Sequence, residues 1–362
     1  QKEYYLTDLI ELAAQEKQGE NKETIEATSS LTHPLYPENL TAGRTEKKKG
    51  ILETDEVTGA LNYSFPIVVP PGRNRLQPTI QLSYNNQQAN NFQNLIGYGW
   101  NIGIPYIDRI NKTGTDKLYT DNYFNSSLSG ELVLVSDTTY APKIENGDFL
   151  RYVYDGTSWV VTDKKGSTYK FGQSAFSRQD DTTGTKIYKW MLEEVRDTNN
   201  NYIKYEYFKD AGQIYPSKIK YTGNGVVDGI FEVEFLREAR IDVNKSFAST
   251  FLVATNYRIN EIQTKVNGIW VKKYTMGYTI GDNGVRSLLA SITESGQGDS
   301  FVVATLPAVS FSYFTSTPGW TLNTTEWASP VYLSDGFQSM LDINGDALPD
   351  IVGSYDTVER PQ

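Results

Sequence analysis

The sequence of 362 residues is long enough to form one large hydrophobic core or two smaller ones. Cysteine is absent, which excludes a disulfide framework, a thiol nucleophile and a Cys-ligated zinc site. The net charge of -10 at pH 7 argues against nucleic acid as a partner, because phosphate binding needs a basic surface.

The histidine count and the apolar runs exclude further classes of protein. His33 is the only histidine, so a His-based catalytic triad or a multi-His metal site cannot form within this chain. No segment approaches the roughly 18 consecutive apolar residues of a membrane-spanning helix, which predicts a soluble chain with no membrane span.

Residues 1–50 are predicted to form a polar N-terminal arm or linker. A short helix is expected near its start, where Asp8 and Glu11 have the spacing of a capping box. The polar, charge-rich stretches that follow are typical of a segment that stays irregular until a partner orders it. A docking arm and a solvated leader without a role both remain open.

From residue 51 onward, apolar and polar residues alternate with the period of a β-strand. In "IFEVEFL", Phe231, Val233 and Phe235 fall on one face, and Glu232 and Glu234 fall on the other. Tyrosine and phenylalanine are abundant, with aromatic residues at 13% of the sequence, which favours sheets with one wet face. The sequence therefore predicts an all-β, antiparallel segment over 51–315.

Turn-forming residues separate the predicted strands. Asn267-Gly268 lies between two alternating runs and is the strongest hairpin signal in the chain. Hairpins of similar plan recur at 190–212 and 257–278. This repetition predicts one long sheet, which must curve or close in order to protect its edges.

One segment, Thr58 to Arg109, carries a less generic pattern. It resembles the opening signature of the SpvB family, which is shared with the B component of bacterial Tc insecticidal toxin complexes. The matching pieces are "YSFPI" at 63–67, "PPGRNRLQP" at 70–78, "LSYN" at 82–85, "GYGWNIG" at 97–103, and then Ile107 and Arg109. Weaker similarity extends over residues 55 to 362.

The glycines around Trp100 in this segment also predict a local structure. Gly97, Gly99 and Gly103 permit close backbone approach around Trp100, which can then pack deeply. A well-built corner of a sheet is the expected result. No residue of the segment has a pattern that indicates catalysis.

The resemblance implies a fold and a role. It implies a long curved antiparallel sheet of hairpins that forms part of an RHS/Tc-type hollow shell, completed by later YD repeats and followed by the start of a β-propeller. The implied function is that of a non-enzymatic scaffold, in which the shell encloses a toxic C-terminal domain. The implied partners are the remainder of the same polypeptide, its encapsulated toxin and a translocation or secretion partner. The implied location is secreted or on the bacterial cell surface.

Residues 316–362 are predicted to begin the first blade of that propeller, and they contain a loop with a metal-binding pattern. The loop "DINGDALPD" resembles the FG-GAP repeat and places oxygen ligands at alternating positions, which suits a structural calcium ion. A turn without a metal is the alternative. The candidate ligands are Asp342, Asn344, Asp346, the backbone carbonyl of Leu348, and Asp350.

Parts of the sequence also match two other functions. Glu232-Val233-Glu234 matches the paired glutamates of ADP-ribosyltransferases, but strand alternation produces such pairs often and no Ser-Thr-Ser strand precedes this one. Any toxic enzyme activity is therefore expected in a C-terminal domain outside this chain. A calcium-dependent surface adhesin or carbohydrate-binding β-protein is the alternative function.

Overall fold

The computed structural model describes residues 50–55, 59–88, 95–281, 286–298 and 300–313, together with the backbone of 338–341 and 350–353. The chain divides into two units, Gln1–Thr315 and Ser316–Gln362, and each is described by itself. The predicted helix of the N-terminal arm lies outside the described residues.

The regular secondary structure of the described residues is nearly all β-strand, which confirms the predicted all-β fold. The helical content among them consists of three short 3-10 turns: η1 Arg73–Arg75, η2 Asn86–Gln88 and η3 Ala175–Ser177. None of the helices in this part of the chain has the length and apolar character that crossing a membrane requires.

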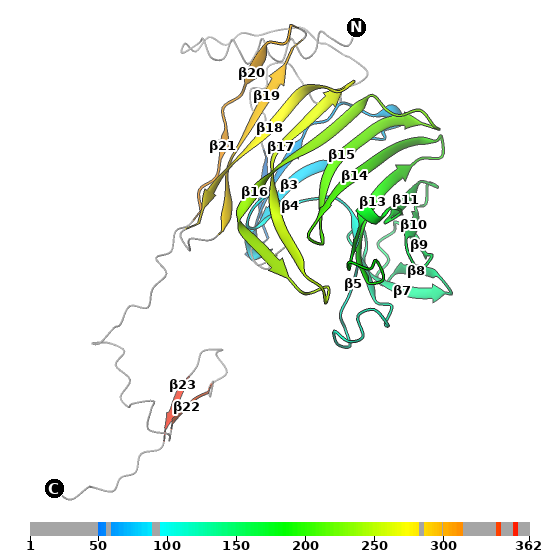
Figure 1. Ribbon diagram of the computed structural model, residues 1–362, viewed down its shortest axis with the longest axis vertical. Coiled ribbons are helices and arrows are strands. Elements are labelled where there is room, and N and C mark those ends of the chain that lie inside the picture. The colour runs from blue at the N-terminus through cyan, green and yellow to red at the C-terminus, as the bar shows by residue number, and fades with distance from the viewer. Residues whose placement is uncertain are drawn as a thin grey trace, which may run out of the picture. The chain divides into compact units, whose positions relative to one another are not determined.

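A long antiparallel sheet dominates the first unit and curves from β13 to β20 (Figure 1). Each strand pairs with its neighbour in sequence as far as β19, which then pairs with both β20 and β21. The predicted growth of the sheet hairpin by hairpin is therefore confirmed. Its strands are β13 Ile187–Arg196, β14 Asn201–Asp210, β15 Gln213–Asn224, β16 Phe231–Ser246, β17 Val253–Val266, β18 Ile269–Ile280, β19 Ser287–Gln297, β20 Val303–Thr305 and β21 Val309–Ser310.

The turn between β17 and β18 shows why the sequence specifies this sheet locally. Asn267 and Gly268 form a two-residue loop in which both residues have positive φ, at 50° and 81°. This geometry gives a hairpin turn whose twist matches that of the flanking strands, and asparagine and glycine tolerate it best. The hairpin predicted at these two residues is therefore confirmed.

A small closed barrel, which the sequence did not predict, adjoins the long sheet. Eight strands form a hydrogen-bonded ring, because β13 pairs with β5 on one side and with β11 on the other. A closed ring leaves no unpaired strand edge. Besides β13, the ring contains β5 Tyr106–Arg109, β6 Phe124–Ser126, β7 Gly130–Ser136, β8 Thr139–Pro142, β9 Arg151–Tyr154, β10 Trp159–Thr162 and β11 Thr168–Phe171; β12 Arg178–Asp180 pairs with β13 beside it.

A second, four-stranded sheet packs on the long sheet, and the two share one hydrophobic core. The ring of Phe65 meets the ring of Tyr274 edge-on, with 6.0 Å between centroids. The hydroxyl of Tyr221 donates to the carbonyl of Pro70 at 2.8 Å. The strands of this small sheet are β1 Ile51–Thr54, β2 Leu61–Ile67, β3 Ile80–Asn85 and β4 Trp100–Ile102.

A buried ionic cluster stabilises an irregularity in β16. The pairing register between β16 and β17 shifts between Ala239 and Asn244, and Asp242 lies in the bulged stretch. Its carboxylate accepts two hydrogen bonds from Arg240, at 2.9 and 2.8 Å, and two from Ser287 on β19, both at 2.6 Å. The cluster therefore ties the bulge to a strand that is distant in sequence.

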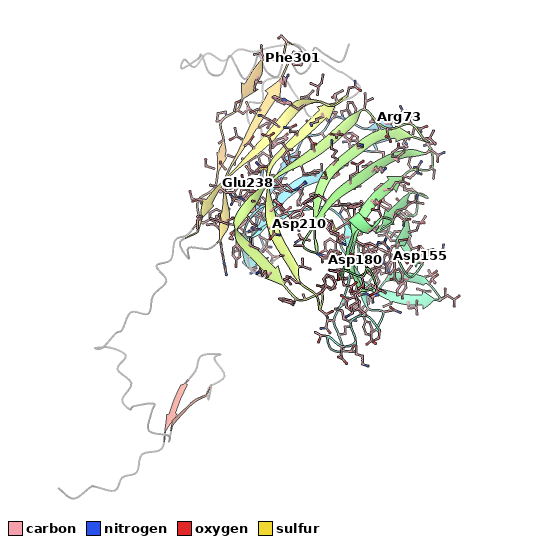
Figure 2. The ribbon with its side chains drawn as sticks, viewed as in Figure 1. Arg73, Asp155, Asp180, Asp210, Glu238 and Phe301 are labelled. Carbon is pink, nitrogen blue, oxygen red and sulfur yellow. The ribbon has the colours of Figure 1, made fainter. Side chains whose placement is uncertain are left out.

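These bonds change the titration of Asp242. Burial alone would raise its pKa, but the hydrogen bonds from Arg240 and Ser287 hold the pKa well below its ordinary value. Arg258 extends the cluster, since it donates to the Ser287 hydroxyl at 2.7 Å and pairs at 2.6 Å with Glu238, the residue labelled in Figure 2. The folded state thus favours the charged form of Asp242.

Asp242→Asn should lower the free energy of unfolding by about 2 kcal/mol at pH 7. A depressed folded-state pKa contributes stability above the unfolded-state pKa of about 4, and this contribution is lost as the pH falls below it. Urea unfolding at pH 7, 5, 4 and 3 should show the difference from wild type shrinking below about pH 4. The exposed control Asp137→Asn should match wild type throughout. An undiminished difference at pH 3 would show that the ionised carboxylate is not responsible.

Candidate functional site

The predicted calcium loop lies mostly outside the described residues, which include only Asp350 among its candidate ligands. The strands on either side of it, β22 Gln338–Leu341 and β23 Asp350–Gly353, pair antiparallel with Leu341 opposite Asp350. The calcium ion and the propeller blade therefore stay predictions. Among the residues that the structure does describe, no group of three His, Cys, Asp or Glu side chains is placed to hold a metal ion.

The Glu232-Val233-Glu234 pair takes part in ion pairs across the long sheet. Lys218 on β15 lies 3.1 Å from Glu232 and 3.2 Å from Glu234, and Lys265 on β17 also contacts Glu234. Burial alone would raise the pKa of Glu234, but its hydrogen bonds with the two lysines lower it. A general acid needs a raised pKa, so Glu234 has the properties of a structural ion-pair partner.

One face of the long sheet carries a series of such cross-strand pairs, which we call the ion-pair face. Its side chains alternate with buried ones such as Ile219 and Val233, which point to the core. Half-buried surface pairs of this kind contribute on the order of 1 kcal/mol or less each, so their main effect is to keep the face polar and locally neutral. The pairs within the sheet are Lys220–Glu206, Lys218–Glu232, Lys265–Glu234 and Lys273–Glu261, and Lys170 on β11 of the barrel pairs with Glu194 on β13.

Trp100 joins the small sheet to the long sheet from the opposite face. Its side chain is 1% exposed, which confirms the predicted deep packing. The indole ring lies 4.8 Å from Phe311 and 5.5 Å from Tyr84, centroid to centroid. The indole N–H donates to the Tyr313 hydroxyl at 2.8 Å, and that hydroxyl donates to the carbonyl of Leu289.

The glycine next to Trp100 has the geometric role that the signature predicted. Gly99 has a φ of +77°, which disfavours any side chain, and a Cβ there would lie 2.6 Å from the Tyr84 ring. The signature thus specifies a tight corner that brings Trp100 and Tyr84 into contact.

Arg109, the last signature residue, is buried at the barrel end of β5. Its guanidinium donates to the carbonyls of Ile187 at 2.9 Å, Asp121 at 3.2 Å and Leu118 at 3.3 Å. No carboxylate among the described residues forms an ion pair with it at 4.0 Å or less. Burial therefore lowers the pKa of Arg109, and backbone carbonyls and ring faces compensate the charge.

The rings around Arg109 form the aromatic core of the barrel. The guanidinium carbon lies 5.0 Å from the Phe124 centroid and 5.6 Å from that of Trp190. Trp190 in turn lies 6.0 Å from Trp159, and both tryptophans are fully buried. The barrel interior is thus filled by side chains and has a structural role.

The arrangement of a long curved sheet, a packed second sheet and a small barrel is the fold of a segment of the Tc toxins. The structure of the Photorhabdus luminescens Tc holotoxin pore matches 85% of this chain with a TM-score of 0.69 and 16% identity. The crystal structure of TcdB2-TccC3 matches 83% with a TM-score of 0.68 and 18% identity. The chain spans 18% of the length of each of these two proteins.

A family model matches part of the sequence itself. The model of the SpvB family, described as the Salmonella virulence plasmid 65kDa B protein, matches residues 55–155 and 138–224. Residues 55–224 therefore resemble the SpvB family, and the resemblance inferred from the signature motifs is confirmed. No curated protein sequence matches the chain.

Proposed function

We propose that this chain is a non-enzymatic scaffold segment of a secreted Tc-type toxin. In this role it forms part of the wall of a β-shell that encloses a C-terminal toxic domain. The observation that carries the proposal is the fold likeness to Tc toxins over 85% of the chain. The wall has one face packed on a second sheet and one face lined by neutralised ion pairs.

The other parts of the proposal follow from the same role. The partners would be the remainder of the polypeptide, its enclosed toxic domain and a translocation or secretion partner, and the location would be extracellular or on the bacterial surface. Any toxic chemistry would belong to the enclosed domain, because Glu232 and Glu234 serve as ion-pair partners here. A structural calcium ion at 342–350 is proposed for the second unit.

Limited proteolysis of the whole polypeptide, which contains both this segment and the enclosed C-terminal domain, tests the proposal. We expect the C-terminal region to be cleaved at least about tenfold more slowly in the native protein than after mild denaturation. Trp100→Ala should reduce this protection because it loosens the wall, whereas the surface variant Gln173→Ala should not. Equal cleavage rates in native and denatured samples would overturn the role in encapsulation.

A further inference from the structure

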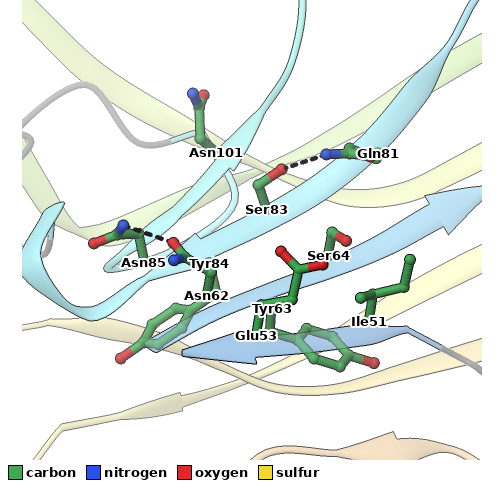
Figure 3. Close-up of a pocket in the computed structure, with 10 residues that line it drawn as sticks. All are labelled: Ile51, Glu53, Asn62, Tyr63, Ser64, Gln81, Ser83, Tyr84, Asn85 and Asn101. Carbon is green, nitrogen blue, oxygen red and sulfur yellow. Dashed lines mark hydrogen bonds between the residues drawn. The ribbon is translucent and has the colours of Figure 1, made fainter. Parts of the chain in front are cut away.

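The face of the small sheet that points away from the core contains an open groove of about 290 Å³ (Figure 3). All four strands of the sheet contribute to its lining. The polar side chains that matter for its chemistry are those of Glu53, Asn62, Ser64, Gln81, Ser83 and Asn101.

Strand alternation and register place five of these six groups in two rows across the sheet, and Gln81 lies opposite Pro66 beside them. Ser64 pairs with Ser83, which pairs with Asn101, and these three form one row. Glu53 pairs with Asn62 in the row beside it. Neighbouring strands lie about 4.8 Å apart and residues two positions apart lie about 7 Å apart, so the rows form a regular grid of polar groups.

The chemistry of this grid differs from that of the ion-pair face. The residues that line the groove include no lysine or arginine, and Glu53 is the one carboxylate among them. Amide and hydroxyl groups both donate and accept hydrogen bonds, whereas lysine only donates. A ligand that matches the grid must therefore also offer closely spaced groups that donate and accept.

Two hydrogen bonds hold parts of the grid in place before any ligand arrives. Asn85 donates to the side-chain oxygen of Asn62 at 2.7 Å, and Gln81 donates to the hydroxyl of Ser83 at 3.1 Å. Fixed polar groups in a concave site reduce the entropy lost on binding.

We infer that this groove binds a neutral oligosaccharide. Adjacent sugar hydroxyls donate and accept, as the grid requires, and the Glu53 carboxylate can accept from a pair of them. An anionic glycan is disfavoured, because the described lining lacks a cation and the whole chain carries a net charge of -10. The sugar would lie across the strands, in contact with both rows.

Titration of the 362-residue chain with maltotriose, cellotriose and triacetylchitotriose, followed by NMR or calorimetry, tests this inference. At least one of these neutral sugars should bind, and sialyllactose should bind at least about tenfold more weakly. Asn62→Ala and Asn101→Ala should each weaken binding about tenfold. Asn101 is exposed, so its variant should keep the wild-type melting temperature.

The matched control is Gln173→Ala, which removes an exposed amide that contacts Ser158 in the barrel, far from the groove in sequence. It should bind the sugar as the wild type does. The inference is overturned if none of the neutral sugars binds, if sialyllactose binds as tightly, or if both groove variants retain full affinity. Because binding and protease protection are separate measurements, failure of one leaves the other standing.

Discussion

Trp100→Ala is expected to lower the free energy of unfolding by about 3–5 kcal/mol, one of the two largest single effects in this chain. The indole is almost fully buried between the two sheets, where it contacts the rings of Tyr63, Tyr84 and Phe311. Its removal would leave a cavity at the junction and free the Tyr313 hydroxyl from one partner. Urea unfolding followed by circular dichroism measures the loss.

A second variant separates packing from hydrogen bonding. Trp100→Phe keeps most of the apolar contact but cannot donate to Tyr313, so it should cost only about 1–2 kcal/mol. Trp270→Ala is the matched control, because Trp270 lies partly exposed on β18 and should cost less than about 1 kcal/mol. If Trp100→Ala were no worse than Trp270→Ala, the two sheets would not depend on this side chain.

Hydrogen exchange would show where the destabilisation acts. The small sheet contributes its packing to the long sheet through the Trp100 junction, so amides of β2 and β3 should lose more protection than those of β15 and β16. Uniform loss over all four strands would instead show that the two sheets unfold as one cooperative unit.

The long strands could be predicted because each shows its period over many residues. In β14, Ile203 and Tyr205 are buried while Lys204 between them is exposed, as the alternation predicted. Asn267-Gly268 fixed one turn by local chemistry alone. Both signals depend only on residues close together in the chain, so a single sequence is enough to show them.

The small barrel could not be predicted for the opposite reason. Several of its strands have only three or four residues, too few to display a period. Its closure depends on the pairing of Ile107 with Trp190, which are far apart in the chain. The hairpin at 159–171 has the same local pattern as the long hairpins, yet it belongs to this ring.

The sequence predicts only part of the groove on the small sheet. Alternation within "LNYSFPI" and "IQLSYN" separates Asn62 and Ser64, or Gln81 and Ser83, from the apolar positions. The rows that these residues form depend on the register between strands, which no single strand encodes. The sequence instead predicted a calcium site in the loop that begins at Asp342, a residue outside the described part of the chain.

The role of Arg109 was missed because arginine is usually assigned to the surface. One signal was present, since Ile107 and Arg109 are two positions apart on one strand and must share a face. Ile107 is fully buried, and Arg109 is 9% exposed. An arginine that shares a strand face with core residues is therefore expected to be buried and to donate to nearby backbone carbonyls.

Arg109→Ala should destabilise the protein by about 3–5 kcal/mol, because it combines a cavity in the aromatic core with carbonyls that lose their donor. Arg109→Met fills most of the space but donates no hydrogen bond, so the carbonyls of Ile187, Leu118 and Asp121 stay uncompensated. We expect it to cost about 2–3 kcal/mol, measured by urea unfolding with tryptophan fluorescence, which reports on Trp159 and Trp190 in the barrel.

The matched control is Arg151→Met, on the exposed side of β9 in the same barrel, which should stay within about 0.5 kcal/mol of wild type. If Arg109→Met were equally neutral, the guanidinium would act only as a filler of space. If it were costly, the barrel would depend on a buried charge that no carboxylate of the described residues pairs with. β13 closes the barrel and also begins the long sheet. The stability lost on Arg109→Met should then also weaken the pairing between β13 and β14.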